Sequence, residues 1–348
     1  MPLSPILLSP NQPPRPYRGG AGISRLRGST APDEYRPEDF VGSVTTIFGE
    51  EHAGLTDLPD GRTLRHAIAS DPEGFLGPHH VARFGSQPEL LVKLLDTAER
   101  LFVHLHPDDA FARRHLGLAH GKTEAWVVIG TRDTDDPYGA GGAHLGFRRA
   151  VSTAEVRAWV HGQHAADMLD AMHHVHVEQG DTILVPGGTP HSIGAGITVV
   201  EVQQPTDLSI LLEYDGFPGL GREQAFLGLD ESLALSALDR GPLSRGDLTA
   251  LIRSGATRLD TEGVTSVLPA QADPFFRVEA IRCFSRVDLD PGYSILVVLD
   301  GEARLTTETG KLDLARGSTA LIPHAAGHLA LDGTATALRC RPAAAAAG

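Results

Sequence analysis

A repeated pattern of glycine, short strand, proline and histidine constrains the fold of this chain more than any other feature of its sequence. The first copy runs from Gly180 to His191, and the second runs from Gly317 to His328. In both copies a proline follows the glycine by six residues and a histidine follows the proline by five. A turn glycine, a buried strand and a proline that ends the strand are typical of β-rich proteins. The repeat therefore predicts two similar β units.

The composition supports a mainly β chain with two barrels of the jelly-roll type, each closing its edges by double-sheet wrapping. The 39 glycines and 24 prolines favour turns and short strands over long helices. Helical spacing is expected in residues 152–174, where Ser152 and Glu155 form a candidate capping box. Two further short helices are expected in residues 231–254, with a break at Gly241-Pro242. After residue 274 the pattern is nearly all β.

These patterns divide the chain into three kinds of segment. Residues 1–150 and 175–220 are expected to form a first barrel. Residues 151–174 and 221–256 are expected to be helical, and residues 257–342 to form a smaller second barrel. The first 40 residues, rich in proline, glycine and arginine, are expected to wrap a folded body as a loop.

Charge and cysteine content exclude several classes of protein. The formal net charge of −14 argues against non-specific nucleic-acid binding, which needs a basic surface. The longest apolar runs have the length of a strand, so we expect no membrane contact. Cys283 and Cys340 are too few for a secreted disulfide scaffold, and we expect them to be free and buried. The N-terminal segment has no basic and apolar leader pattern, which favours a cytoplasmic location.

Four residues are candidate ligands of a divalent metal. In a strand, His104 and His106 point to the same face, because side chains alternate with a period of two. Glu124 lies in the segment 121–129, which enters an apolar strand, so its carboxylate needs a partner or a metal. His191 of the first repeat completes a set that suits Zn²⁺, Mn²⁺, Fe²⁺ or Co²⁺. Since the chain has 17 histidines, an accidental His-x-His pair of ordinary histidines is the alternative.

Two further residues are candidates for the chemistry. Glu201 lies in the apolar segment 197–204, and burial can raise the pKa of such a carboxyl toward neutrality, as a general base requires. The alternative for Glu201 is a carboxylate that holds a ligand histidine or a nearby arginine. Lys122 alternates with Glu124 and Trp126 onto one face. The second repeat keeps His328 but has no His-x-His pair before it, so we expect the second barrel to lack a metal site.

The chain resembles the type I mannose-6-phosphate isomerases of the cupin superfamily. The resemblance covers most of the chain and depends on segments 91–96, 103–109, 121–126 and 185–204, the last of which includes Pro186-Gly187-Gly188-Thr189-Pro190-His191. It implies a zinc-dependent cupin that interconverts mannose 6-phosphate and fructose 6-phosphate. It also implies a catalytic barrel, a helical insertion and a smaller C-terminal barrel. The family's metal ligands fall on His104, His106, Glu124 and His191, and its active-site positions include Lys122 and Glu201.

Three positions depart from the family pattern. The family usually has Gln at the position of His104, Ser at the position of Phe102, and an arginine at the position of Leu211. Without that hydroxyl and that guanidinium, the chain lacks charge-assisted contacts suited to a phosphorylated substrate. Either another cation takes their place, or the substrate is not mannose 6-phosphate. The candidate cations are Lys93, Arg148, Arg149 and Arg222, and the substrate-binding candidates are Lys93, Phe102, Asp207, Leu211 and Arg222.

The sequence thus predicts a metal-dependent aldose–ketose isomerase that acts on a sugar or sugar phosphate through a cis-enediolate. The metal would act as a Lewis acid, Glu201 would carry the proton, and Lys122 would stabilise the developing oxyanion. The alternatives are an isomerase or epimerase of a non-phosphorylated sugar, a non-catalytic sugar-binding cupin, and an iron-dependent dioxygenase-type cupin. The sequence does not predict an oligomeric state.

Overall fold

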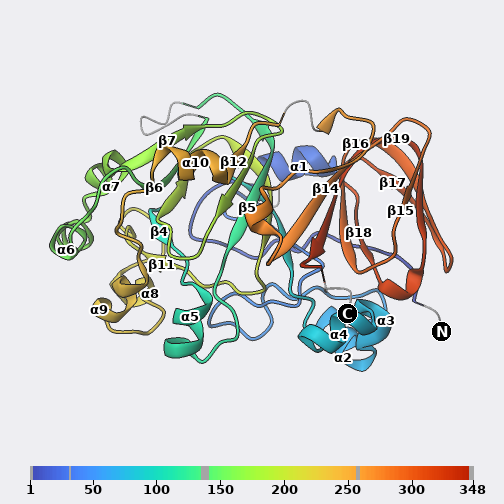
Figure 1. Cartoon of the computed structure of the whole chain (residues 1–348), viewed down its shortest axis with the longest axis horizontal. Helices are drawn as coiled ribbons and strands as arrows, with labels where there is room; N and C mark the ends of the chain where they lie inside the picture. The colour runs from blue at the N-terminus through green and yellow to red at the C-terminus, as the bar shows by residue number, and fades with distance from the viewer. Residues whose placement is uncertain (1–2, 31–32, 135–140, 256–258, 345–348) are drawn as a thin grey trace.

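Strands dominate the described part of the chain and form three antiparallel sheets (Figure 1). The computed structural model describes residues 3–30, 33–134, 141–255 and 259–344. The strands of the six-stranded sheet, in spatial order, are β12 (Ile252–Arg253), β8 (Thr182–Val185), β5 (Glu124–Thr131), β10 (Ile197–Gln203), β3 (Leu91–Asp96) and β2 (Glu38–Val41). Those of the five-stranded sheet are β11 (Ile210–Leu211), β4 (His104–Leu105), β9 (His191–Ile193), β6 (Gly142–Phe147) and β7 (Met172–His176). These two sheets carry His104, Glu124 and His191, and His106 directly follows β4.

The third sheet lies at the other end of the molecule and comes almost entirely from the C-terminal part of the chain (Figure 1). Its strands are β1 (Ile6–Leu7), β13 (Gly263–Ser266), β14 (Phe276–Cys283), β15 (Arg286–Leu289), β16 (Ser294–Thr307), β17 (Lys311–Ala315), β18 (Thr319–Ile322) and β19 (Leu329–Pro342). The two repeats of the sequence form β8 and β18, as expected. Each strand ends just before the proline of its repeat, Pro186 or Pro323, because proline has no N–H to donate to a ladder.

The mainly β prediction is confirmed, but two closed barrels are not. In the described residues the six-stranded sheet runs from edge strand β12 to edge strand β2, and the five-stranded sheet runs from β11 to β7. Hydrogen bonds therefore close neither sheet. Short strands contribute to this result, because β4 and β11 are two residues long and prolines such as Pro107 interrupt the backbone donors nearby.

The helices are short and lie around the sheets (Figure 1). They are α1 (Ala21–Arg27), α2 (Leu64–Ser70), α3 (Pro72–Leu76), α4 (Pro78–Phe84), α5 (Asp109–Phe111), α6 (Thr153–Gly162), α7 (Ala165–Ala171), α8 (Arg222–Ala225), α9 (Glu231–Ala234) and α10 (Arg245–Leu251). Both hydrogen bonds of the predicted capping box form, from Ser152 to the Glu155 backbone and from Glu155 to the Ser152 backbone. The helix prediction was wrong for residues 172–174, because they pair with β6 as part of β7. Thus α6 and α7 connect two strands that are neighbours in one sheet.

The N-terminal segment contacts both ends of the molecule. Strand β1 pairs with β18 of the C-terminal sheet, and β2 pairs with β3 of the six-stranded sheet. Between them, the ring of Tyr17 lies 6.1 Å from the ring of Phe102, edge to face. The segment therefore wraps the body, as expected, although it also contains a helix and two strands.

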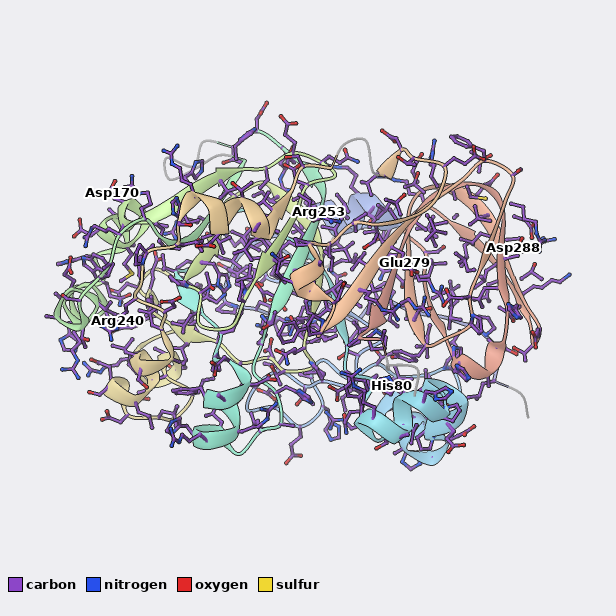
Figure 2. All side chains as sticks on the ribbon, in the orientation of Figure 1. His80, Asp170, Arg240, Arg253, Glu279 and Asp288 are labelled. Carbon is purple, nitrogen blue, oxygen red and sulfur yellow. The ribbon has the colours of Figure 1, made fainter. Side chains whose placement is uncertain are left out.

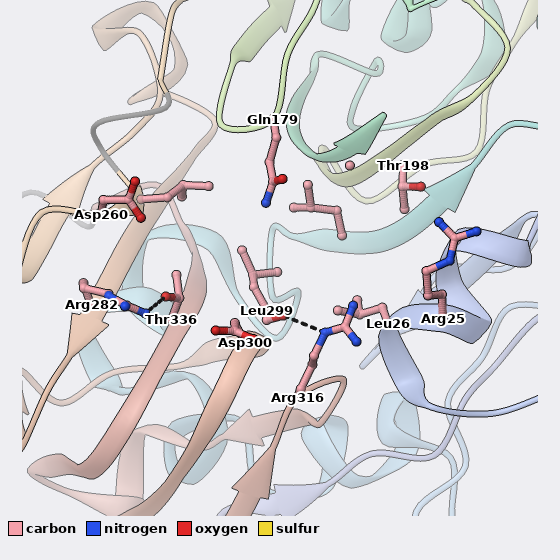
Figure 3. A pocket seen from close by; sticks show the side chains of 14 residues that line it. Arg25, Leu26, Gln179, Thr198, Asp260, Arg282, Leu299, Asp300, Arg316 and Thr336 are labelled. Atoms are coloured by element: carbon pink, nitrogen blue, oxygen red, sulfur yellow. Dashed lines mark hydrogen bonds between the residues drawn. The ribbon is translucent and has the colours of Figure 1, made fainter. Parts of the chain in front are cut away.

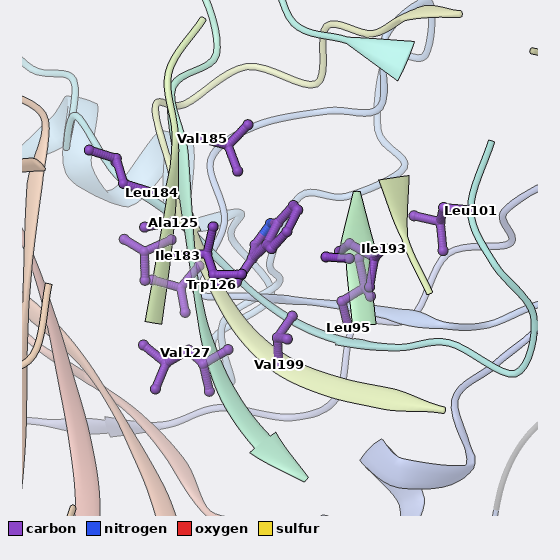
Figure 4. Packing of buried hydrophobic residues seen from close by; sticks show 14 of the residues in the cluster. Leu95, Leu101, Ala125, Trp126, Val127, Ile183, Leu184, Val185, Ile193 and Val199 are labelled. Carbon is purple, nitrogen blue, oxygen red and sulfur yellow. The ribbon is translucent and has the colours of Figure 1, made fainter. Parts of the chain in front are cut away.

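Apolar side chains fill the space between the sheets. Trp126, Val127, Ile183 and Val199 belong to one cluster of buried residues between β5, β8 and β10 (Figure 4). Charged side chains such as Asp170 and Asp288 project at the periphery (Figure 2). Both cysteines are buried and free, as predicted. No helix in the described residues has the length and apolar character needed to cross a bilayer.

Candidate metal centre

Two neighbouring strands bring the three candidate histidines together. His104 of β4 pairs directly with His191 of β9, and His106 follows two residues later on the same face. The ring centroids lie 4.1 Å apart for His104 and His191, 4.7 Å for His106 and His191, and 4.9 Å for His104 and His106. One nitrogen atom from each ring lies within 4.8 Å of the other two. The His-x-His pattern therefore forms a buried imidazole cluster, rather than three unrelated histidines.

Backbone carbonyls orient all three rings in the same way. The Nδ1 atom of His104 lies 3.0 Å from the Phe102 carbonyl oxygen, and that of His106 lies 2.6 Å from the Leu208 carbonyl oxygen. The Nδ1 atom of His191 lies 2.9 Å from the Thr189 carbonyl oxygen. Because a carbonyl only accepts, each Nδ1 carries the proton, and each Nε2 keeps its lone pair. Such contacts from the non-ligating nitrogen are typical of histidines that bind metals.

Glu124 lies beside this cluster at the start of β5. Its Oε2 atom is 3.0 Å from His106 Nε2, and its Oε1 atom is 3.4 Å from His191 Nε2. The indole N–H of Trp126 donates to Oε1 at 3.0 Å, which fixes the plane of the carboxylate. The Nζ atom of Lys122 lies 2.7 Å from Oε2 and 3.0 Å from His106 Nε2. Lys122, Glu124 and Trp126 thus share one face, as their alternation predicts.

The surroundings keep the imidazoles of His104 and His106 neutral and the carboxylate of Glu124 charged. Burial, and then the Lys122 ammonium group, lower the pKa of His106 to about 3. Burial and the other two imidazoles lower the pKa of His104 well below its usual value. Burial opposes ionisation of Glu124, but the charge of Lys122 outweighs it and holds the pKa of Glu124 well below its usual range. Neutral imidazole and charged carboxylate are the forms that bind a divalent cation.

This donor set fits a divalent metal ion. Three imidazole nitrogens and a carboxylate, all less than a tenth exposed, form a nitrogen–oxygen set without thiolate. Among the described residues, the His191 Nε2 atom is buried and makes no hydrogen bond. A buried polar atom in that condition is costly unless a ligand satisfies it. His104, His106, Glu124 and His191 are therefore the residues that would hold the ion.

A small pocket extends from this cluster. Its lining residues are Arg15, Tyr17, Glu38, Lys93, Leu95, Leu101, Phe102, His104, Lys122, Glu124, Trp126, His191, Ile193, Glu201 and Ser209. The cavity volume is about 30 Å³, close to one water molecule's share of the liquid. Side chains must therefore move to admit a sugar. Phe102 lines the pocket, and its ring packs against that of Phe217, 5.2 Å away.

Buried charges surround the pocket beyond the histidines. Lys93 Nζ lies 3.2 Å from Glu38 Oε2, 3.2 Å from Asp207 Oδ1 and 3.7 Å from Glu201 Oε1. Arg15 contacts Glu38 at 3.0 Å and Asp207 at 3.1 Å. Burial, and then the charge of Glu124, raise the pKa of Glu201 to about 7. Glu201 thus has the acidity that a proton carrier needs near neutral pH.

Comparisons with known proteins agree with the architecture. The family profile of the mannose-6-phosphate isomerase cupin domain matches residues 269–342. The mannose-6-phosphate isomerase of Streptococcus mutans is 29% identical over 249 residues, which cover 70% of this chain and 71% of that protein. ManA of Bacillus subtilis, also a mannose-6-phosphate isomerase, is 33% identical over 146 residues, 40% of this chain and 43% of its own length. The chain is therefore similar to the type I mannose-6-phosphate isomerases of the cupin superfamily.

Solved structures of this family share the fold. The mannose 6-phosphate isomerase of Bacillus subtilis superposes with a TM-score of 0.73 at 21% identity, covering 97% of this chain and 100% of that one. A variant of phosphomannose isomerase from Salmonella typhimurium gives a TM-score of 0.72 at 15% identity, covering 98% and 100%. The likeness therefore extends over the whole chain, beyond the segment that the profile matches.

Three of the substrate-binding candidates, Phe102, Leu211 and Asp207, lie in different places relative to the histidine cluster. Phe102 lines the pocket, and its ring lies 5.0 Å from the ring of His104. Leu211 is buried directly opposite His104 in the β4–β11 pair. Asp207 contacts Lys93 but lines a neighbouring surface pocket instead.

Of the four candidate cations, Lys93 alone lines the pocket beside the histidines. Arg222 is exposed and pairs with Glu231 at 2.6 Å. Arg148 pairs with Asp170, and Arg149 pairs with Glu155, both at the surface. None of these three arginines lines that pocket.

Three residues of the N-terminal segment, Arg15, Tyr17 and Glu38, line the pocket but were not predicted from the sequence. Tyr17 and Glu38 are joined by a short hydrogen bond, and Arg15 contacts the same carboxylate. No local motif marks these residues, since their partners lie far along the chain. The one available signal is the unusual density of arginine in a proline- and glycine-rich segment.

Proposed function

We propose that this protein is a metal-dependent aldose–ketose isomerase, which interconverts mannose 6-phosphate and fructose 6-phosphate through a cis-enediolate. The observation that carries the proposal is the convergence of three Nε2 lone pairs and the Glu124 carboxylate beside Glu201. Similarity to mannose-6-phosphate isomerases supports the enzyme class. One divalent ion, Zn²⁺ first and Mn²⁺, Fe²⁺ or Co²⁺ otherwise, would supply Lewis acidity toward the substrate oxygens.

The residues of the chain would divide the proton chemistry between them. Glu201 would accept the proton from C2 of the aldose and return it to C1. The proton of the C2 hydroxyl would pass to the oxygen on C1, so that the C2 oxygen becomes the ketone and no atom is lost. Lys122, buried beside Glu124, would donate a charge-assisted hydrogen bond to the oxygen that gains negative charge. The aromatic wall at Phe102 would exclude water from the enediolate.

A second candidate is an isomerase or epimerase of a non-phosphorylated sugar. The positive charges of Arg15 and Lys93 in the pocket are already neutralised, since each of the two side chains contacts Glu38 and Asp207. A phosphate dianion would have to compete with those carboxylates for the same donors. The aromatic ring of Phe102 suits the apolar face of a neutral sugar better than a phosphate.

Turnover of a substrate panel tests the proposal. Purified, metal-analysed protein is given mannose 6-phosphate, fructose 6-phosphate, mannose, fructose and lyxose. We expect conversion of the phosphorylated pair. Conversion of the free sugars alone would support the second candidate. Tight binding of sugars without turnover, over several metals, would instead indicate a sugar-binding cupin and contradict both.

Turnover should decrease at acid pH because of Glu201. As a base, Glu201 must be deprotonated, and burial and Glu124 raise its pKa to about 7. A bound divalent cation lowers the pKa of a nearby carboxyl. We therefore expect kcat/KM to fall as pH falls through a pKa between the ordinary 4.5 and 7. A profile that stays flat across this interval, on a protein that keeps its metal, would exclude Glu201 as the base.

Trp126 should tune metal affinity without binding the ion. Replacing Trp126 with Phe removes the indole N–H that holds Glu124 Oε1, while it keeps an aromatic ring in the core. Loss of such an outer contact costs about ten- to a hundredfold in metal affinity. Competition with a fluorescent chelator measures the change. Trp159→Phe is the matched control, since Trp159 lies on α6 away from the histidines. Equal affinities in both variants would contradict the role of Trp126.

Three broader statements are also part of the proposal. The sheets would correspond to two cupin barrels with a helical insertion, over the residue ranges predicted above. The second barrel would hold no metal, because its repeat keeps His328 without a His-x-His pair before it. The location would be the cytoplasm, which the two free thiols support.

A further inference from the structure

A larger cavity lies between the six-stranded sheet and the C-terminal sheet (Figure 3). Its volume is about 490 Å³, within the range of sites for small molecules. The lining residues are Gly22, Arg25, Leu26, Ile129, Gly130, Gln179, Thr198, Leu259, Asp260, Arg282, Leu299, Asp300, Arg316 and Thr336. No residue is shared with the pocket at the histidine cluster. The cavity is therefore a separate feature of the molecule.

Three arginines from separate elements line this cavity. Arg25 comes from α1, Arg282 from β14, and Arg316 from the turn between β17 and β18 (Figure 3). Within the described residues, none of the three forms an ion pair with a carboxylate. Arg316 donates from Nε to the Leu299 carbonyl oxygen at 3.3 Å, and Arg282 donates from Nη1 to the Thr336 hydroxyl. The remaining guanidinium donors have no carboxylate partner in that part of the chain.

The charge of the cavity is opposite to that of the protein. Its lining carries three arginines against two carboxylates, Asp260 and Asp300, so the difference is one positive charge. The whole chain carries a formal charge of −14. A local excess of positive charge on an acidic protein attracts an anion to this cavity. The buried Nε of Arg282, which makes no hydrogen bond in the described residues, adds a donor without a partner.

Apolar and neutral polar groups complete the lining. Leu26, Ile129 and Leu299 supply apolar surface, while Gln179 and Thr198 reach the cavity from the turn before β8 and from β10 (Figure 3). A bare inorganic ion would leave most of this volume and its apolar walls unused. An organic molecule that carries one phosphoryl group would use both, because guanidinium matches phosphate oxygens and the apolar walls match carbon.

We propose that this cavity is a binding site for a phosphorylated small organic molecule, separate from the metal centre. The phosphoryl group would bind at Arg25 and Arg316, and the organic part would contact Leu26, Ile129 and Leu299 toward the end of the cavity where Arg282 lies. The site joins α1, the ends of β5 and β10, and the C-terminal sheet. Its occupant would therefore tie together segments that are far apart in the chain and would raise the thermal stability of the protein.

The metal centre and this site lie on the same two strands. Ile129 and Gly130 belong to β5, which begins at Glu124, and Thr198 belongs to β10, which also carries Glu201. Five residues of extended strand separate Glu124 from Ile129, a span of roughly 16 Å at about 3.3 Å per residue. An occupant of the cavity therefore cannot contact the metal ligands, and the two sites can be tested independently.

Calorimetric titration of the whole protein with phenyl phosphate tests the proposal. Inorganic phosphate and phenol are the comparison probes, since they carry the charge alone and the ring alone. We expect phenyl phosphate to bind more tightly than either. The double variant Arg25→Gln with Arg316→Gln should weaken phenyl phosphate by roughly tenfold or more, as the loss of charge-assisted hydrogen bonds predicts. Both arginines are exposed, so the fold should tolerate the change.

Two control variants make the result specific. Arg114→Gln removes an exposed arginine from the segment after α5, outside the cavity, and should bind phenyl phosphate as the parent does. His191→Ala changes the metal centre and should also leave this binding unchanged. The proposal is overturned if phenyl phosphate fails to bind at millimolar concentration, if the double variant binds as the parent does, or if His191→Ala abolishes binding.

Discussion

Replacing His191 with alanine is expected to remove both the metal and the catalytic activity. His191 is fully buried, its Nδ1 is held by the Thr189 carbonyl, and its Nε2 makes no hydrogen bond among the described residues. The Nε2 atom is therefore the part of the ring that remains available to bind a ligand. Alanine leaves two imidazoles and one carboxylate, which together are a weaker site for a divalent ion.

Metal content and turnover should decrease together in this experiment. Elemental analysis after dialysis is expected to give metal near one ion per chain for the parent and near zero for His191→Ala. Isomerase turnover should decrease to background in the variant. His106→Ala should behave in the same way, because the Leu208 carbonyl holds that ring in the equivalent orientation.

A second buried histidine provides the control. His80→Ala also removes a buried ring, but His80 contacts the Gln87 carbonyl and lies on α4, outside the histidine cluster. Its metal content and turnover should stay near those of the parent. Full activity of the parent protein after removal of its metal by a chelator would refute the proposed mechanism, whatever the variants do.

The histidine cluster was largely predictable because its signals are local. His104 and His106 share a face through the period of two in a strand, and the spacing of the first repeat locates His191 after β8. Glu124 was identifiable as a carboxylate entering an apolar strand. Each of these inferences needs only a few neighbouring residues.

The outer part of the pocket was not predictable, because its residues come from distant parts of the chain. Arg15 and Glu38 reach Asp207 and Lys93 through the path of the N-terminal segment, which no local pattern encodes. The same limit applies to Arg222, whose partner Glu231 draws it to the surface. Closure of the sheets is likewise a property of strand ends, where prolines and short strands decide the pairing.

Replacing Glu201 with glutamine is expected to abolish most of the turnover while the metal stays bound. Glutamine has nearly the same shape, but it cannot accept a proton from carbon. Loss of a general base costs about a hundred- to ten-thousandfold in rate. The four candidate ligands are untouched, so the metal content should remain that of the parent. Glu213→Gln is the matched control, because that buried carboxylate holds Arg100 and the Val103 backbone rather than the pocket.

The same variant should gain stability relative to the parent as the pH rises, and this separates a proton carrier from a structural carboxylate. Because the pKa of Glu201 is raised from 4.5 to about 7, the fold favours its neutral form. That contribution is present below pH 4.5 and is lost as the pH rises through 7. Glutamine is neutral throughout, so in metal-free protein the melting temperature of Glu201→Gln should increase relative to the parent across this interval. If Glu201 served mainly as an ionised partner of Lys93 and Lys122, glutamine would destabilise the protein most at high pH. Melting curves of the two metal-free proteins at several pH values distinguish these opposite trends.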